Sequence, residues 1–278
     1  MRTDHHIHMV LDGVDWKHAI GRHREKVDTA WVKKTLSAYQ ALGYDHLRDG
    51  GDRWGVSAYA RSVSKEYGIT YRTPLAPISK LGHYGGFIGE QYETLKDYAE
   101  LVKQHRRDGA DFIKIMISGL MDFDRFGVLT EPGMAPEEIK ELIRIAHGDG
   151  FSVMAHANGA RTVQAAAEAG VDSVEHGAYL DEEALYAMKE AGTVWVPTLS
   201  TVGNLRGKGR FEERAVCRIL ESALENVAAF HKIGGLVAAG TDAGAWAVPH
   251  GCGTEEKLLA CAGVTQLSFA DARLKEKF

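Results

Sequence analysis

The sequence predicts an α/β fold, a TIM (β/α)8 barrel, on three observations. Strand-like and helix-like segments alternate along the chain from residue 28 onward. Short apolar runs such as residues 151–155 and 235–240 are typical of parallel strands that are buried on both sides. No GxGxxG follows the first strand and no GxxxxGK[ST] occurs, which disfavours the alternative, a doubly wound open sheet. We therefore expect residues 1–278 to form one barrel domain, a normal length for this architecture.

The alternation places eight strands along the chain. We expect them at residues 5–11, 44–48, 69–75, 111–117, 151–155, 171–175, 193–198 and 235–240. Segments of helical period lie between them, at residues 29–42, 89–107, 136–149, 161–169, 181–191 and 211–233. A glycine precedes many of the strands, where it can end the helix at positive φ: Gly43, Gly68, Gly109, Gly150, Gly170 and Gly192.

Composition excludes several classes of partner. The chain has 33 Lys and Arg residues against 38 Asp and Glu, a formal net charge of −5, which disfavours binding to nucleic acid or to an anionic membrane. We find no 18-residue apolar run and no signal-peptide pattern at the start. Cys217, Cys252 and Cys261 form neither a CxxC pair nor a disulfide framework. A cytoplasmic protein with a small-molecule substrate is the expected class.

Residues Asp4 to His8 contain an HxH pair at the start of the chain. If the pair lies on a strand, the side chains of His6 and His8 point to one face and Ile7 packs behind them. Two imidazoles on one face can hold a metal ion. By itself this signal is weak, because such pairs also arise by chance.

Further polar groups stand at the ends of later strands. Lys114 lies in the apolar run 111–117, where an amine is costly to bury. Either the lysine snorkels to the surface, or its amine is carboxylated by CO2 and bridges two metal ions. His156, His176 and Asp242 follow the fifth, sixth and eighth strands, at the rim where barrels carry their active sites. A histidine-rich set on five strands favours Zn²⁺ over Mg²⁺ or Ca²⁺.

Together these motifs resemble the amidohydrolase superfamily. The resemblance rests on the DxHxH of residues 4–8, FIKIM at 112–116, AHANG around His156, VEHG at 174–177 and GTDAG at 240–244. Within the superfamily the chain is similar to the prolidase-like branch of Xaa-Pro dipeptidases and N-acyl amino acid hydrolases, which uses a carboxylated lysine. The similarity covers most of residues 4–265.

The resemblance implies a centre of two divalent metal ions. His6, His8 and Asp242 would hold one ion and His156 and His176 the other, with carboxylated Lys114 and a hydroxide bridging them. Zn²⁺ is the expected metal, and Mn²⁺ and Co²⁺ fit similar ligands. The implied reaction is hydrolysis of a C–N bond, in a dipeptide or an N-acyl amino acid, by attack of the bridging hydroxide. Asp242 would pass the proton to the leaving amine.

Several loop residues are candidates for substrate contacts. His83, in the glycine-flanked segment 81–86, matches a family histidine that points at the substrate, and we expect it to stabilise the carbonyl oxygen or to bind a carboxylate. Weaker candidates are Tyr84, Asn158, Tyr179 and Arg206, each of which could instead only cover surface. The basic segment 206–210 is either a lid that attracts a carboxylate or a solvated loop.

Two structural roles are also expected near the site. Arg48 and Asp49 end the second strand, and a buried ion pair that supports the site is the predicted role. Glu175 should face away from the neighbouring His176 if the strand alternates regularly, so a purely structural role is predicted.

The sequence departs from the prolidase-like pattern at its ends. Those relatives carry a small β-sandwich, but here only three residues precede Asp4 and 36 follow Asp242, so we expect most or all of the sandwich to be lacking. The uncovered barrel flank predicts a homo-oligomer contact. Three other functions remain open. They are a mononuclear zinc deaminase, which needs no lysine on the fourth strand, a lactonase or phosphotriesterase, and a non-catalytic metal-binding barrel.

Overall fold

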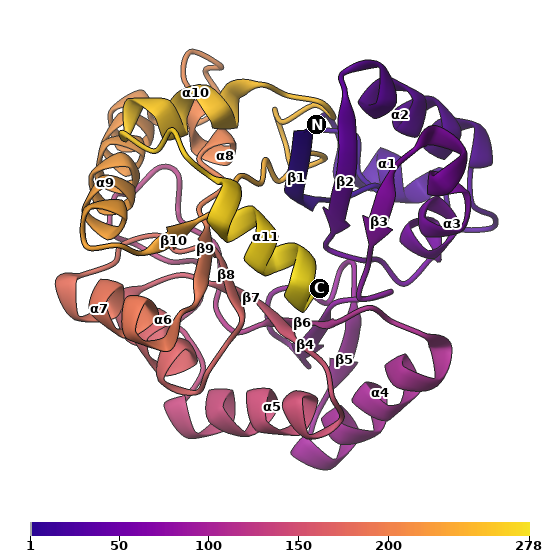
Figure 1. Cartoon of the computed structure of the whole chain (residues 1–278), viewed down its shortest axis with the longest axis horizontal. Helices are drawn as coiled ribbons and strands as arrows, with labels where there is room; N and C mark the ends of the chain where they lie inside the picture. The colour runs from indigo at the N-terminus through magenta and orange to yellow at the C-terminus, as the bar shows by residue number, and fades with distance from the viewer. Residues whose placement is uncertain (1) are drawn as a thin grey trace.

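The computed structural model describes residues 2–278 and has the α/β barrel architecture (Figure 1). Helices surround a central set of strands, as Figure 1 shows. Every pair of named neighbouring strands is parallel. Because parallel strands end at the same edge, the residues that follow them gather at one mouth. The predicted fold class is confirmed.

The strands form two hydrogen-bonded sheets. The first has the order β1 (Arg2–Ile7), β2 (Tyr44–Asp49), β3 (Thr70–Arg72). The second has the order β10 (Leu236–Val237), β9 (Val194–Val196), β8 (Ser173–His176), β7 (Val153–Ala157), β6 (Ile113–Met116), β4 (Ile78–Lys80), β5 (Glu90–Tyr92). All strands of the described chain belong to these sheets, and residues 2–278 contain no β-sandwich.

Most of the helices lie around the outside of the strands, and the last one, α11, lies across one end of the barrel (Figure 1). The helices are α1 (Trp16–Gly21), α2 (Thr29–Ala41), α3 (Val56–Val63), the 3-10 helix η1 (Ser64–Tyr67), α4 (Leu95–Asp108), α5 (Pro136–Gly148), α6 (Ala160–Glu168), α7 (Glu182–Ala191), α8 (Ser200–Gly203), α9 (Glu213–Lys232), α10 (Thr254–Cys261) and α11 (Ser268–Lys277). The glycines expected to end helices all have positive φ, between 67° and 84°. This part of the prediction is confirmed.

Hydrogen bonds join the segment that follows β10, the last strand, to β1. The amide of His5 donates to the carbonyl of Ala239 at 3.0 Å, and the amide of Asp242 donates to the carbonyl of His6 at 2.7 Å. Asp4 strengthens this seam because its buried carboxylate accepts from the amide of Thr241 at 2.9 Å and from its hydroxyl at 2.6 Å. The seam places Asp242 beside the HxH pair, although the two lie more than 230 residues apart.

The third predicted strand is interrupted. β3 ends at Arg72, and the chain resumes pairing only at β4, between the predicted third strand and the predicted helix that follows it. Pro74 and Pro77 lie in the interruption and have no amide hydrogen to donate. β5 then pairs with β4 within the segment predicted as helical, so α4 begins at Leu95 rather than near residue 89.

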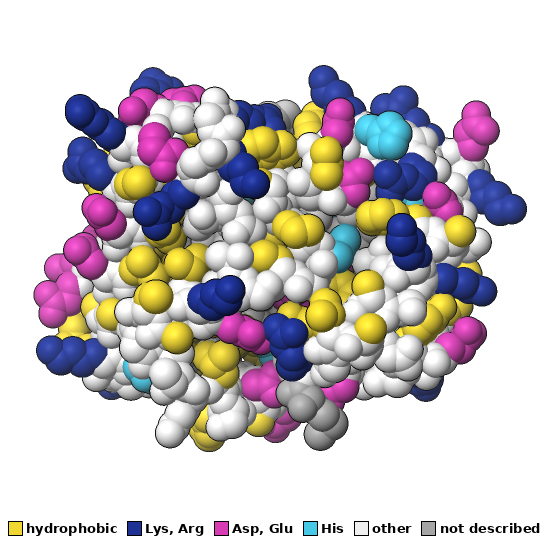
Figure 2. All heavy atoms as spheres, turned by 90° about the horizontal axis from the view of Figure 1, so that it is seen from above, with side chains coloured by type: hydrophobic (Ala, Val, Ile, Leu, Met, Phe, Trp, Pro, Cys, Tyr) yellow, Lys and Arg dark blue, Asp and Glu magenta, His cyan; other side chains and the backbone are white. Residues whose placement is uncertain are grey.

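The helix α11 crosses in front of the strands in Figure 1 and covers one end of the barrel. Its buried residues Ala270 and Leu274, with Phe278, pack in one cluster with Phe112 and Met154 of the barrel. On the face shown in Figure 2, positive and negative side chains are interspersed rather than gathered in one patch. No helix within residues 2–278 is long and apolar enough to cross a bilayer.

Candidate metal centre and substrate pocket

The HxH pair and Asp242 form a compact group of potential metal ligands. The Nε2 atoms of His6 and His8 are 3.4 Å apart. Oδ1 of Asp242 lies 3.2 Å from Nε2 of His8 and 3.5 Å from Nε2 of His6. The ligand atoms of these three residues all lie within 4.8 Å of one another. The sequence prediction that they come together is thereby met, although 234 positions separate His8 from Asp242.

The electrostatics of Asp242 fit a cation site. Its Oδ1 atom is buried and accepts no hydrogen bond within residues 2–278. Burial alone would raise the pKa of this carboxyl, but the neighbouring imidazoles of His6 and His8 hold it well below its usual range. An ionised, unpartnered oxygen beside two imidazoles is a donor set that suits a divalent ion such as Zn²⁺.

Lys114 lies on β6 and faces the same centre. Its side chain is buried, and Nζ lies 2.9 Å from Nε2 of His6. The alternative in which this lysine snorkels to the surface is therefore wrong. Burial lowers the pKa of Lys114 to about 8. A buried amine with this pKa loses its proton more readily than a surface lysine does.

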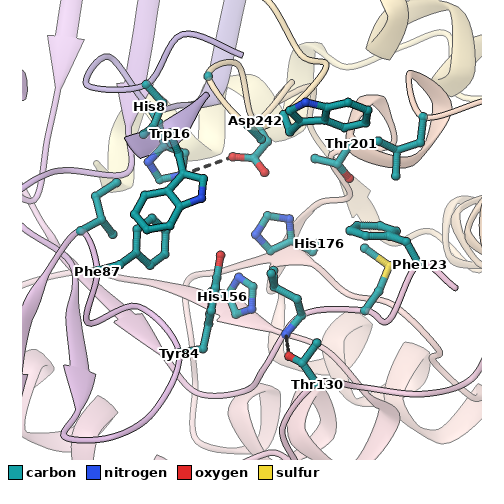
Figure 3. Close-up of a pocket in the computed structure, with 18 of the residues that line it drawn as sticks. His8, Trp16, Tyr84, Phe87, Phe123, Thr130, His156, His176, Thr201 and Asp242 are labelled. Atoms are coloured by element: carbon teal, nitrogen blue, oxygen red, sulfur yellow. Dashed lines mark hydrogen bonds and ion pairs between the residues drawn. The ribbon is translucent and has the colours of Figure 1, made fainter. Parts of the chain in front are cut away.

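His156 and His176 stand at the ends of β7 and β8 (Figure 3). Their ring centroids are 4.6 Å apart, and His176 lies 5.1 Å from His6. Burial lowers the pKa of His176 to about 3 and that of His156 well below its usual value, so both rings are neutral at pH 7. Nδ1 of His176 pairs with the hydroxyl of Thr198 at 2.7 Å, which leaves Nε2 as the atom able to bind a metal.

Strained backbone surrounds the site. His176, Thr198 and Asp242 have φ of 69°, 48° and 57°, in the left-handed region that non-glycine residues rarely adopt. Each such residue costs on the order of 1–3 kcal/mol. At His176 the strain breaks the regular alternation of β8, so the side chains of both Glu175 and His176 reach the site.

Glu175 contacts a metal-ligand candidate, so the expectation that it has a purely structural role is wrong. Its Oε2 atom lies 2.7 Å from Nδ1 of His6, and its Oε1 atom accepts from Arg48 at 2.7 Å. The predicted ion pair between Arg48 and Asp49 is also wrong, because Arg48 pairs with Glu175. Asp49 instead accepts hydrogen bonds from the amide of Met9 and the hydroxyl of Tyr71, at 2.8 Å and 2.5 Å.

A pocket of about 900 Å³ opens above these residues. Figure 3 shows Trp16, Tyr84 and Phe87 on one side and Phe123 on the other, with His156 and His176 between them. The rings of Trp16 and Phe87 are 5.3 Å apart, and Tyr84 lies 4.9 Å from His156. The second side continues through Phe211 and Trp246. We call the two sides the Trp16 wall and the Trp246 wall.

Each wall carries a cation. The guanidinium of Arg210 lies 4.3 Å from the ring centroid of Trp246, and the ammonium of Lys17 lies 5.5 Å from that of Trp16. Both residues line the pocket. Neither forms an ion pair with a carboxylate in the part of the chain that the structure describes. A negatively charged group in the pocket would therefore find unpaired cations.

The remaining predicted site residues divide into two groups. Tyr84 and Asn158 line the pocket, and Asn158 also joins two loops through the carbonyl of Gly119 at 3.0 Å and the amide of Ala178 at 3.0 Å. The structure does not bring His83, Tyr179 or Arg206 into the pocket lining. His83 is 44% exposed and pairs with Glu131 at 3.3 Å, Tyr179 meets Phe126 edge-on, and Arg206 is exposed.

Apart from Tyr84, the sequence did not reveal the aromatic residues of the two walls. Trp16, Phe87 and Phe123 lie in the segments that directly follow the first, third and fourth predicted strands. Aromatic residues in such segments of a barrel were an available signal, because these loops form the mouth of the pocket. Nothing in the sequence indicated which of these aromatics face one another.

Comparison with known proteins identifies the family. Residues 48–271 match the amidohydrolase family. The ochratoxinase of Aspergillus niger is 31% identical over 233 residues, which cover 75% of this chain and 47% of that protein. An uncharacterized protein of Mycobacterium tuberculosis is 30% identical over 175 residues, 61% of this chain and 46% of that protein. This chain thus spans about half the length of the curated relatives it matches.

Solved structures share the fold. A Xaa-Pro dipeptidase with bound methionine superposes with a TM-score of 0.77 at 23% identity, over 98% of this chain and 74% of that one. The Aspergillus niger ochratoxinase structure gives 0.77 at 24% identity, over 96% and 68%. The family match covers most of the chain, including four of the five strands that carry the metal-ligand candidates. The chain belongs to the amidohydrolase family.

Proposed function

We propose that this amidohydrolase is a binuclear metal-dependent enzyme that hydrolyses an amide or peptide bond of a dipeptide or an N-acyl amino acid. The observation that carries the proposal is the convergence of six residues from β1, β6, β7, β8 and the segment after β10 beneath one pocket. A non-catalytic barrel has no need of four histidines, a buried lysine and a buried carboxylate at one place.

The donor set divides into two groups. His6, His8 and Asp242 would hold one ion, and His156 and His176 the other, with Lys114 between them as a carbamate. In that modification the unprotonated amine attacks CO2, a N–C bond forms and one proton is released, so a buried cation becomes an anion. Bound divalent ions would supply a nucleophilic water of lowered pKa and would polarise the scissile carbonyl.

Asp242 is the residue that would move the proton. Its low pKa keeps it ionised at neutral pH, so it can accept a proton from the attacking water. Asp242 lines the pocket, so it could then donate that proton to a leaving amine bound there. Neutral His156 and His176 do not compete for the proton, because burial disfavours their charged forms.

The pocket favours a substrate with an apolar group and a free carboxylate. Aromatic walls on both sides can bury flat or apolar groups, each of which gains roughly 1.5–3 kcal/mol on full burial. Arg210 offers a planar guanidinium suited to bidentate binding of a carboxylate. Arg210 belongs to the basic segment 206–210, for which attraction of a carboxylate is one of the two predicted roles. Similarity to a Xaa-Pro dipeptidase and to ochratoxinase supports this substrate class.

The test is a library of dipeptides and N-acyl amino acids, assayed with Zn²⁺ and bicarbonate present. We expect release of a free amine from members with an apolar acyl group, about two ions per chain by metal analysis, and a mass increase of CO2 on Lys114. One ion per chain with an unmodified amine would refute the binuclear mechanism. Ammonia release from an aminopurine would favour the mononuclear deaminase, and turnover of esters alone would favour a lactonase.

A further inference from the structure

A continuous line of contacts runs from the C-terminal end of the chain to the metal-ligand candidates. It begins at Phe278, which follows α11 and is 5% exposed. The ring of Phe278 meets Phe112 edge-on, with centroids 5.0 Å apart. The guanidinium carbon of Arg48 lies 4.5 Å from the centroid of the Phe278 ring. Phe278 therefore covers a cation buried inside the barrel.

Arg48 is held in one position. Its side chain is 0% exposed, and each of its three nitrogens donates a hydrogen bond. Nε donates to the carbonyl of His5 at 2.7 Å, Nη1 to the hydroxyl of Ser173 at 2.9 Å, and Nη2 to Oε1 of Glu175 at 2.7 Å. A buried charge with this many partners is costly to rearrange. Arg48 thus fixes the carboxylate of Glu175.

Glu175, held in place by Arg48, orients the ring of His6. Its Oε1 atom accepts from Arg48 and, at 2.7 Å, from the hydroxyl of Ser173, while its Oε2 atom accepts from Nδ1 of His6 at 2.7 Å. This bond places the proton of the neutral ring on Nδ1. Nε2 of His6 is then a lone-pair donor that points toward Lys114 and Asp242.

We infer that Arg48 and Glu175, braced by Phe278, are positioning residues that hold His6 in the tautomer and orientation needed to bind a metal ion. A carboxylate behind a histidine ligand raises its basicity as well as orienting it. The C-terminal helix thereby tunes a metal site from the opposite end of the barrel. This inference rests on the metal site of the proposed function, but not on the identity of the substrate.

The competing explanation is that the Arg48–Glu175 pair only holds the strands together. The two explanations differ in what a substitution changes: a purely structural pair would affect the free energy of unfolding, whereas a positioning pair also affects metal affinity. Glu255 provides a matched control. It is a second fully buried carboxylate, bonded to the amides of Leu199 and Ser200 at 3.0 Å and 2.7 Å, and it has no contact with a histidine ligand.

The experiment measures Co²⁺ affinity of the 278-residue chain, stripped with a chelator, by competition with a chromophoric chelator. Circular dichroism and thermal unfolding report the fold of each variant. We expect Glu175→Gln to weaken the Co²⁺ site roughly 10- to 100-fold and to change its visible absorption. Phe278→Leu should weaken it roughly three- to tenfold. Glu255→Gln, and Leu274→Ala in the same buried cluster as Phe278, should lower the melting temperature while leaving Co²⁺ affinity within about twofold.

The inference is overturned if folded Glu175→Gln binds Co²⁺ as wild type does, or if Glu255→Gln weakens the site equally. If Glu175→Gln does not fold, Phe278→Leu decides, and unchanged affinity in that variant refutes the positioning role. Absence of Co²⁺ binding in wild type refutes both this inference and the proposed function. Wild-type Co²⁺ binding with no turnover of any amide refutes the proposed function alone.

Discussion

Replacement of Lys114 by methionine should stabilise the metal-free protein while removing its metal chemistry. The pKa of Lys114 falls from 10.5 to about 8 on burial. Each unit corresponds to about 1.4 kcal/mol, so the protonated amine destabilises the metal-free fold by about 3 kcal/mol at pH 7. Methionine has a similar length and no charge. It loses the contact with His6 at 2.9 Å, which offsets about 1 kcal/mol of the gain.

The assay for Lys114→Met is urea unfolding in the presence of a chelator. We expect the free energy of unfolding to exceed that of wild type by roughly 1–3 kcal/mol at pH 7. The unfolded chain keeps the lysine proton to a higher pH than the folded chain does. Wild-type stability should therefore rise between pH 8 and 10.5, and the variant should lack this rise. In the same variant, metal analysis should find neither ion bound tightly.

The matched control is Lys80→Met on the adjacent strand β4. Lys80 is 35% exposed and pairs with Glu138 at 2.9 Å, so its replacement should change the free energy of unfolding by less than about 1 kcal/mol and leave metal binding intact. A metal-free Lys114→Met variant that is less stable than wild type would refute the strain assigned to the buried amine. A variant that still binds two ions would refute the role of Lys114 as a metal ligand.

Three further substitutions test other parts of the site. In Gly50→Ala, the new Cβ would lie 2.8 Å from Nδ1 of His8, so Co²⁺ affinity should fall at least about tenfold. In the control Gly21→Ala the new Cβ meets nothing within 4 Å, so this variant should bind Co²⁺ normally. Equal Co²⁺ affinities of the two variants would contradict crowding of His8. Burial raises the pKa of Glu255 to about 8, so its contribution to stability is complete below pH 4.5 and is lost as the pH rises through 8. The unfolding free energy of wild type should accordingly fall relative to Glu255→Gln by up to about 1.4 kcal/mol per unit between pH 5 and 8, and parallel pH curves would disprove the assignment. Arg210→Met should raise KM for N-acyl amino acids roughly tenfold with little change in kcat, and should not affect the corresponding amides that lack a carboxylate; an equal effect on both substrates would refute a role in binding the carboxylate.

Local patterns in the sequence were sufficient to predict the fold class and to predict that the metal-ligand candidates lie close together. Parallel strands end at one edge of a barrel, so His156 and His176 had to lie near each other once their strands were recognised. Lys114 stood out because an amine inside an apolar strand is costly to bury. Its burial and its contact with His6 agree with that reasoning. Carboxylation of Lys114, the number and identity of the metal ions, and the oligomeric state stay predictions.

Only the tertiary structure decided which loop residues enter the pocket and what supports the ligands. His83 and Arg206 match plausible patterns, but loop conformation depends on contacts distant in sequence. Of the loop candidates, only Tyr84 and Asn158 line the pocket, and Arg210 rather than Arg206 represents the basic segment there. The role of Glu175 was missed for a different reason. Regular alternation along a strand was assumed, and the left-handed backbone at His176 breaks it. The sequence thus determined which side chains could take part in catalysis, because residue type and strand period are local properties. Only the tertiary structure decided which partners those side chains have, because the partners depend on strained turns and long-range packing.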